Sequence, residues 1–180
     1  MSKLYLVRHG KCDWNDTHVI GDADRPLTEN GLVDAKKAAD SLRDVIFDIA
    51  YTSHLQRARI TAEVIMAYHL SKRLIVVPEF KERCDGIYQG QLRVELGDYF
   101  TETEFSYEKK FPEGESLRDV EGRTVPKLRE ILRENQGFDI VIVSHAHVMR
   151  TFHKFLTGCS GDEVASKQWE NGRVYTYDIK

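Results

Sequence analysis

The stretch LYLVRHG, residues 4–10, decides how this chain can fold. Its apolar part, residues 4–7, is typical of a buried β-strand, and Gly10 indicates where that strand ends. Ligands of α/β proteins bind at the carboxyl ends of the strands. Arg8 and His9 are therefore predicted at a binding edge, where an arginine beside an imidazole suits an anion and a nucleophile better than it suits packing.

Composition limits the class of protein. The 180 residues are enough for one ordinary core, and 41% hydrophobic with 31% charged residues is typical of a globular chain, so we expect a single domain over residues 1–180. The formal net charge is −3, from 26 basic and 29 acidic residues, so no overall field attracts nucleic acid or an anionic membrane. An anion must instead bind at a local cluster of positive charge.

Cysteine usage and hydropathy indicate a cytoplasmic protein. The three cysteines, Cys12, Cys84 and Cys159, are odd in number, far apart and without C-x-x-C spacing, which favours reduced thiols. No apolar run approaches the length of a membrane span, and the N-terminus lacks the apolar core of a signal peptide. We therefore expect a cytoplasmic protein with no membrane or nucleic-acid partner.

Apolar periodicity predicts that strands and helices alternate along the rest of the chain. Further strands are expected at residues 47–51, 74–77, 139–143 and 173–179, and helices at 28–42, 55–68, 116–134 and 148–156. This alternation is typical of a parallel sheet covered on both faces. The predicted fold class is therefore α/β, a three-layer α/β/α sandwich with a mainly parallel sheet.

One long segment, residues 79–111, has no clear periodicity and is rich in aromatic and charged residues. Connections of this length are often functional lids. We expect irregular structure here, with a short cap over the site around residues 85–111 and substrate specificity in residues 91–111. Its aromatic side chains, which either cover a substrate or pack the lid, are Tyr88, Tyr99, Phe100, Phe105 and Tyr107.

Reactive or cationic residues follow three of the predicted strands. Arg8 and His9 end the first strand, Arg57 lies just beyond the polar turn at residues 52–54, and His145 follows the fourth strand. Parallel strands end at one edge of a sheet, so these arginines and histidines would converge at helix N-termini, whose amides also favour anions. A tetrahedral dianion such as a phosphoryl group fits this description.

Six sequence elements resemble, in the same order, motifs of the histidine phosphatase superfamily, also called the phosphoglycerate mutase-like family. They are LVRHGKCDWN, RPLTENGLVDA, YTSHLQRARITAEVI, FKERCDGIYQG, FPEGESLRDVEGR and VIVSHAHVMR. The match runs from Lys3 to Arg150. The resemblance implies the phosphoglycerate mutase-like form of the three-layer fold.

The resemblance also implies roles for five catalytic residues. His9 would attack phosphorus and become a phosphohistidine, which splits one displacement into two easier ones. Arg8, Arg57 and His145 would keep the His9 imidazole neutral and hold the phosphoryl oxygens, so that no metal or other cofactor is required. Glu82 would protonate the leaving group and then activate water, a role for which we expect burial or the anionic substrate to raise its pKa.

A phosphate cradle is implied as well. The amides near Gly10 and Gly21 and the side chain of Asn15 would contact the phosphoryl group. Ala146 and His147 stand where the family usually has Gly-Gly or Gly-Asn, so Ala146 would narrow access to the backbone and His147 would offer another donor. Further departures from the family pattern, all at the expected substrate rim, are Lys11, Cys12, Asp85 and Tyr88-Gln89.

Four functions are compatible with these motifs. The first is a metal-independent phosphomonoesterase acting on a small phosphorylated metabolite, which the short stretch between Glu82 and His145 favours. The second is a cofactor-dependent phosphoglycerate mutase, and the third a non-catalytic phosphate or phosphoprotein binder. The fourth, a metal hydrolase, rests on His145-x-His147 with His9 and His54, but no H-E-x-x-H motif accompanies them. No pattern predicts an oligomeric state or a particular substrate.

Overall fold

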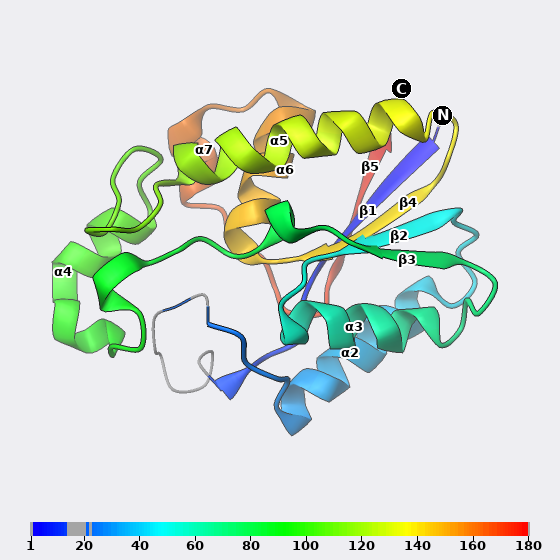
Figure 1. The fold of residues 1–180 in the computed structure, drawn as a ribbon, viewed down its shortest axis with the longest axis horizontal. Coiled ribbons are helices and arrows are strands. Elements are labelled where there is room, and N and C mark those ends of the chain that lie inside the picture. The colour runs from blue at the N-terminus through cyan, green and yellow to red at the C-terminus, as the bar shows by residue number, and fades with distance from the viewer. Residues whose placement is uncertain (1, 14–20, 22, 180) are drawn as a thin grey trace.

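A five-stranded sheet forms the centre of the molecule (Figure 1). The computed structural model describes residues 2–13, 21 and 23–179. The strands are β1 (Ser2–Arg8), β2 (Ile49–Thr52), β3 (Arg73–Val76), β4 (Ile140–Ser144) and β5 (Val174–Ile179). They follow the order β3-β2-β4-β1-β5, in which β3, β2, β4 and β1 run parallel and β5 is antiparallel to β1. The predicted, mainly parallel sheet is confirmed.

Helices cover both faces of this sheet. α2 and α3 lie against one face, and α5 and α6 lie against the other (Figure 1). The helices are α2 (Glu29–Leu42), α3 (Gln56–Met66), α4 (Arg93–Glu104), α5 (Leu117–Glu134), α6 (Ala146–Thr157) and α7 (Gly161–Ala165). Within the described part of the chain, no helix is both long enough and apolar enough to cross a lipid bilayer. The three-layer sandwich is therefore as predicted.

Alternation along β1 divides the core into two layers. Leu4 and Leu6 pack with α5 and α6, whereas Tyr5 and Val7 pack with α2 and α3. All four side chains are buried, because successive residues of a strand point to opposite faces of the sheet. The strand that carries Arg8 at its end is thus held between both layers.

Two predicted helix starts are confirmed by their side-chain caps. Oγ1 of Thr28 accepts the N–H of Gly31 at 3.1 Å, where α2 begins. Oγ of Ser116 accepts the N–H of Asp119 at 3.1 Å, and the Asp119 carboxylate accepts the N–H of Ser116 at 3.0 Å. This reciprocal pair is a capping box, which begins α5. α6 differs slightly, since it begins at Ala146 rather than at the expected position 148.

Residues 79–111 are more regular than the sequence predicts. They include most of the single-turn 3₁₀ helix η1 (Pro78–Phe80), a second such turn η2 (Gly86–Tyr88) and the whole of α4. α4 bends at Gly97, where φ is 51°. The expectation of irregular structure is therefore wrong for α4, whose apolar residues form no continuous buried stripe.

Residues 85–111, the predicted cap, are called the cap segment from here on. Within it, Tyr88 and Phe100 pack around Phe111, which is fully buried. The ring centroids of Tyr88 and Phe111 lie 5.5 Å apart in an edge-to-face arrangement. These aromatic residues therefore build the interior of the cap segment itself.

Candidate active site

The ends of three parallel strands bring the predicted site residues together. The strand register pairs Arg8 of β1 with Ser144 of β4, and Thr52 of β2 with Val143 of β4. The N–H of His9 also donates to the carbonyl oxygen of Ser144 at 3.0 Å. The turns that follow β1, β2 and β4 therefore begin at one edge of the sheet, as the sequence predicts.

The ring of His9 is buried, and two neighbours fix its tautomer. Nδ1 lies 2.6 Å from the carbonyl oxygen of Gly10, which can only accept, so Nδ1 carries the proton. Nε of Arg57 lies 3.3 Å from Nε2 and can only donate, so Nε2 carries the lone pair. The nitrogen that can act as a nucleophile is therefore Nε2.

His145 lies beside His9 and is completely buried. The two ring centroids are 5.0 Å apart, and the ring planes are inclined at 60°. Burial is the main cause that lowers the pKa of both imidazoles well below the usual histidine value, and the charge of Arg57 lowers both further. Both rings are therefore neutral near pH 7. Among the described residues, neither nitrogen of His145 has a hydrogen-bond partner.

The two predicted arginines flank the imidazoles in different ways. Arg57 is buried near the start of α3, and its Nη1 donates to the carbonyl oxygen of Ala23 at 2.8 Å. Arg8 donates from Nη1 to the carbonyl oxygen of Trp169 at 2.6 Å, while its Nε is buried without a partner in the described part of the chain. The charges of both arginines lower the pKa of His9, and Arg57 in addition lies within hydrogen-bond distance of Nε2.

Glu82 belongs to the same buried cluster. Its Oε1 accepts the backbone N–H of Arg83 at 2.9 Å and that of His147 at 3.3 Å, and lies 3.1 Å from Nδ1 of His147. Burial acts to raise the pKa of Glu82, but the interaction with His147 and these hydrogen bonds outweigh it, so the pKa lies well below the usual value. The expectation that burial raises this pKa is therefore wrong, and the expected effect of the anionic substrate stays a prediction.

His147 does not have the role predicted from the sequence, that of a donor to substrate. Its Nδ1 faces Glu82, and its Nε2 lies 3.2 Å from Oε2 of Glu104. An imidazole has two hydrogen-bonding atoms, and carboxylates engage both of them. The prediction failed because Glu104 ends α4, a helix that the sequence pattern does not indicate.

Glu104 links the cap segment to the rest of the site. Besides facing His147, its carboxylate accepts Nη2 of Arg83 at 2.7 Å and Nη1 of Arg150 at 3.3 Å. Arg83 pairs in addition with Asp85, whose Oδ1 lies 2.9 Å from the arginine Nε. Asp85, one of the departures at the predicted rim, thus serves to neutralise a buried arginine.

The predicted cradle residues lie in different settings. The N–H of Gly10 itself donates to Oγ1 of Thr61 at 3.1 Å, and a phosphate contact by the amides near it stays a prediction. Gly10 is required for packing, because a Cβ there would lie 2.1 Å from the carbonyl oxygen of Gly31. Gly21 has a φ of 151°, which favours glycine. Asn15 lies outside the described residues.

Three departures from the family pattern surround the end of β1 and the start of α6. Ala146 is the first residue of α6, so its N–H is among the donors that a helix N-terminus leaves unpaired. Cys12 is buried, while the side chain of Lys11 is exposed. The backbone N–H of Lys11 donates to Oδ2 of Asp34 at 3.3 Å.

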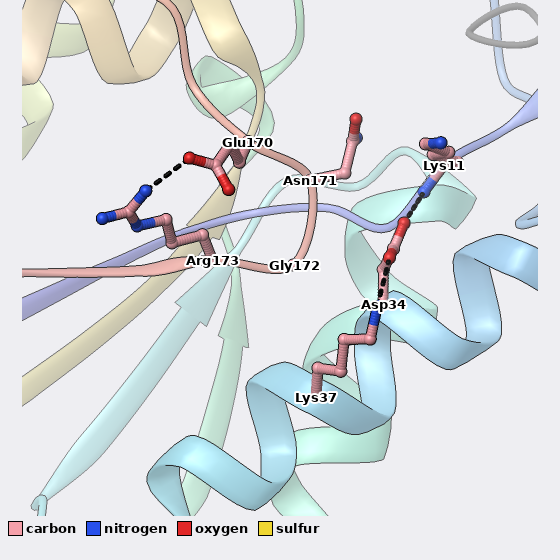
Figure 2. Close-up of a pocket in the computed structure, with 7 residues that line it drawn as sticks. All are labelled: Lys11, Asp34, Lys37, Glu170, Asn171, Gly172 and Arg173. Atoms are coloured by element: carbon pink, nitrogen blue, oxygen red, sulfur yellow. Dashed lines mark hydrogen bonds and ion pairs between the residues drawn. The ribbon is translucent and has the colours of Figure 1, made fainter.

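A loop before β5 holds the end of β1, a contact that the sequence does not indicate. Nδ2 of Asn171 donates to the carbonyl oxygen of His9 at 2.7 Å, and the N–H of Gly172 donates to that of Arg8 at 2.9 Å. Figure 2 shows both residues lining a cavity together with Lys11, Asp34, Lys37, Glu170 and Arg173. A lone asparagine in a loop carries no sequence signal, so the fold is needed to identify Asn171 as a support of the His9 backbone.

The histidines considered for a metal hydrolase have separate surroundings. His54 is exposed, whereas His9 and His145 lie side by side and His147 faces two carboxylates. Across residues 2–13, 21 and 23–179, no group of three or more His, Cys, Asp or Glu side chains is placed to hold a metal ion.

This fold and this site define a protein of the phosphoglycerate mutase-like class, an α/β sandwich with paired histidines at the ends of its strands. The family model of the histidine phosphatase superfamily (branch 1) matches residues 4–180. The chain therefore belongs to the histidine phosphatase superfamily, as the six sequence elements predict.

Its relatives carry the names of phosphatases and of mutases. A phosphoserine phosphatase of Entamoeba histolytica, solved in complex with 3-phosphoglyceric acid, is 30% identical with a TM-score of 0.84, over 98% of this chain and 90% of its own. An alpha-ribazole phosphatase of Shigella flexneri is 26% identical with a TM-score of 0.85, over 99% and 91%. A 2,3-bisphosphoglycerate-dependent phosphoglycerate mutase of Bartonella henselae is 32% identical over 189 residues, covering 97% of this chain and 92% of its own.

Proposed function

We propose that this protein is a phosphomonoesterase that hydrolyses a small phosphorylated metabolite without a metal ion, through a phosphohistidine at His9. The observation that carries the proposal is the tautomer of His9, with Nδ1–H bound to the carbonyl of Gly10 and the lone pair of Nε2 beside Arg57. A neutral imidazole with a directed lone pair is the form of histidine that attacks phosphorus.

In the first step, Nε2 of His9 bonds to phosphorus while the ester P–O bond breaks and its electron pair leaves on the ester oxygen. Enzymatic phosphoryl transfer depends mainly on positioning and on stabilising the charge of the phosphoryl oxygens. Arg8, Arg57 and the ring N–H of His145 can supply that stabilisation, which Mg²⁺ supplies in kinases. Their proximity to the His9 ring supports this assignment.

Glu82 is the proposed general acid and base. The protonated carboxyl gives its proton to an alkoxide leaving group, and the carboxylate later takes a proton from the water that attacks the phosphohistidine. Oε1 of Glu82 accepts the N–H of His147, two residues beyond His145, which supports its placement near the reacting phosphorus. Residues 85–111 would cover the site as a cap, joined to it through Glu104.

Phosphoglycerate mutase is a second candidate, because the Bartonella henselae relative carries that name. A mutase must shield its phosphohistidine from water until the phosphoryl group is returned to a substrate hydroxyl, which favours a larger cap. The short stretch between Glu82 and His145 supports hydrolysis over isomerisation.

The test is a phosphate-release screen of the purified protein over a panel of phosphorylated metabolites, with and without EDTA. We expect release that persists in EDTA and is abolished by His9→Ala in a protein that keeps its circular dichroism spectrum. Isomerisation of 3-phosphoglycerate without phosphate release would favour the mutase. Binding of phosphate esters without turnover would indicate a non-catalytic binder, and activity lost in EDTA and restored by a metal ion would indicate a metal hydrolase.

A further inference from the structure

The side chain of Glu104, at the end of α4, contacts two buried arginines beside the imidazole pair. We propose that Glu104 determines substrate specificity by occupying these arginines, so that the substrate is a phosphomonoester whose organic group carries no acid. This inference rests on the proposed hydrolysis through His9 and names the substrate class of that same site. Phosphate esters of uncharged alcohols belong to this class, whereas phosphoglycerates and phosphoserine, which carry a carboxylate, do not.

Two arginines of the site remain available to the phosphoryl group. Arg57 donates to Nε2 of His9 at 3.3 Å and to the carbonyl oxygen of Ala23 at 2.8 Å. Arg8 donates to the carbonyl oxygen of Trp169 at 2.6 Å. These acceptors, the ones found for the two arginines in the described part of the chain, are all neutral. Two positive charges therefore face the one or two negative charges of a phosphoryl group.

Arg83 and Arg150 have carboxylate partners instead. Nη2 of Arg83 lies 2.7 Å from Oε2 of Glu104 and 2.8 Å from Oδ1 of Asp85. Nη1 of Arg150 lies 3.3 Å from Oε1 of Glu104. Removing one partner of a buried ion pair is strongly destabilising, so these contacts hold the Glu104 side chain in place. The protein's own carboxylates thus fill the positions at which an acidic substituent of a substrate would bind.

These ion pairs lie on the side of the site where the leaving group departs. A general acid contacts the leaving oxygen when it donates its proton, so the organic group begins at Glu82. In the described part of the chain, the hydrogen bonds that Glu82 accepts all end on Oε1, so Oε2 is available to the leaving group. The imidazole of His147 alone separates Oε1 of Glu82 from Glu104, with 3.1 Å on each side. The organic group therefore begins within one imidazole ring of a second carboxylate.

Electrostatics at Glu104 disfavour a further negative charge. Burial acts to raise the pKa of Glu104, but its interactions with His147 and the two arginines outweigh it, so the pKa lies well below the usual value and Glu104 is ionised near pH 7. Nη1 of Arg83 is buried without a partner among the described residues. A neutral oxygen can accept this N–H, but a substrate carboxylate would be the third anion on one guanidinium. Burying such an unmatched charge is costly.

The experiment compares esters that differ only in the acidic group. Glycerol 3-phosphate has a hydroxymethyl group where 3-phosphoglycerate has a carboxylate, and phosphoethanolamine lacks the carboxylate of phosphoserine. Each ester competes with p-nitrophenyl phosphate for the site, so its inhibition constant is measurable whether or not the ester is hydrolysed. For the wild type we expect the acidic member of each pair to have an inhibition constant at least about tenfold higher, the effect of one unmatched charged contact.

Glu104→Gln tests the assignment to this residue. Glutamine keeps the size of the side chain and removes its charge, which frees both arginines to pair with a substrate carboxylate. The ratio of the two inhibition constants should then shift towards the acidic ester by at least about tenfold. Glu102→Gln, on the same helix, removes an exposed carboxylate that lies 2.7 Å from Nζ of Lys109, and this control should leave the ratio unchanged.

Three outcomes would overturn the inference although hydrolysis stands. They are equal inhibition by both members of each pair in the wild type, a ratio that Glu104→Gln leaves unchanged, and an equal rise of both constants in Glu104→Gln, which would assign Glu104 to support of the cap segment alone. The wild-type ratio requires no variant, so it decides the matter if Glu104→Gln does not fold. If the wild type releases no phosphate from p-nitrophenyl phosphate, the proposed function fails, and calorimetric titration with the same esters measures the ratio instead.

Discussion

The guanidinium Nε of Arg57 donates to Nε2 of His9 across 3.3 Å, on the ring nitrogen opposite the one that donates to Gly10. The arginine thus fixes the direction of the imidazole lone pair and adds a positive charge that lowers the pKa of the ring. A phosphoryl group approaching Nε2 would meet this guanidinium first. One residue on α3 therefore both orients the imidazole of the proposed nucleophile and places a positive charge beside it.

We predict that Arg57→Ala lowers kcat about 10²- to 10³-fold, the range found when one preorganised donor to a transition-state charge is removed. Arg57→Lys should recover part of this loss, because it restores the charge without the planar N–H group. Arg59→Ala on the same helix removes an exposed arginine that pairs with Glu63 at 3.5 Å, and it should leave kcat unchanged. Steady-state kinetics would contradict the assignment if Arg57→Ala kept kcat within a few-fold of the wild type.

Gly10 should tolerate no side chain. A Cβ at this position would lie 2.1 Å from the carbonyl oxygen of Gly31, and both backbones are fixed by the packing of β1 against α2. We expect Gly10→Ala to lower the free energy of unfolding by about 3 kcal/mol or more, at the upper end of the cost of overpacking. Gly122→Ala is the matched control, because no atom lies within 4 Å of its added Cβ in α5.

Chemical denaturation monitored by circular dichroism checks both glycine variants. Gly122→Ala should raise the free energy of unfolding by about 0.5–1 kcal/mol, since alanine is the better helix former. Equal stability of the two variants would show that the close approach of Gly10 to Gly31 does not constrain the fold.

Asn171 should matter for activity although it is distant from His9 in the sequence. Its Nδ2 donates to the carbonyl oxygen of His9 at 2.7 Å, and loss of this bond would let the end of β1 move. We predict an approximately tenfold fall in kcat for Asn171→Ala, which corresponds to about 1.4 kcal/mol, the upper end of the worth of one hydrogen bond. Lys37 lines the same cavity, where its Nζ lies 3.7 Å from Oδ1 of Asp34, and Lys37→Ala should leave kcat unchanged (Figure 2). Equal rates for the two variants would contradict a supporting role for Asn171.

Stability should fall with acid because two imidazoles are buried in the neutral form. The pKa values of His9 and His145 lie well below the ordinary 6.5, mainly because of burial. As the pH falls below 6.5, the unfolded chain binds protons at both rings while the folded protein does not, so the free energy of unfolding decreases. Each ring contributes a slope of up to about 1.36 kcal/mol per pH unit.

Urea denaturation between about pH 6.5 and pH 5 measures that slope. His145→Gln should reduce it by up to about 1.36 kcal/mol per pH unit, because one buried neutral ring is removed. His54→Gln, which changes an exposed histidine, should leave it unchanged. A free energy of unfolding that is independent of pH across this range would mean that the rings are protonated in the folded protein.

The sequence predicted those residues of the site that lie at, or just after, the carboxyl end of a strand. Apolar runs placed β1, β2 and β4 within a few residues, and parallel strands must end at one edge, so His9, Arg57 and His145 could be brought together from pattern alone. Glu82 required the resemblance to a family, because it follows a 3₁₀ turn that has no periodicity.

The contacts that the sequence could not predict come from side chains far apart in the chain. Glu104 reaches His147 from a helix whose apolar residues form no stripe, and this contact changes both the expected role of His147 and the pKa of Glu82. The N–H of Gly10 donates to Oγ1 of Thr61, and nothing in the sequence around this helix residue indicates the contact. Such pairings depend on tertiary packing, which single-sequence patterns do not encode.

The most direct test of the account is to trap the phosphorylated enzyme. The protein is mixed with an aryl phosphate carrying a radiolabelled phosphoryl group, quenched in alkali within the first turnover, digested and mapped by mass spectrometry. We predict one acid-labile phosphoryl group on the ring of His9, and none in His9→Ala. A label on another residue, or phosphate release by His9→Ala near the wild-type rate, would contradict catalysis through this histidine.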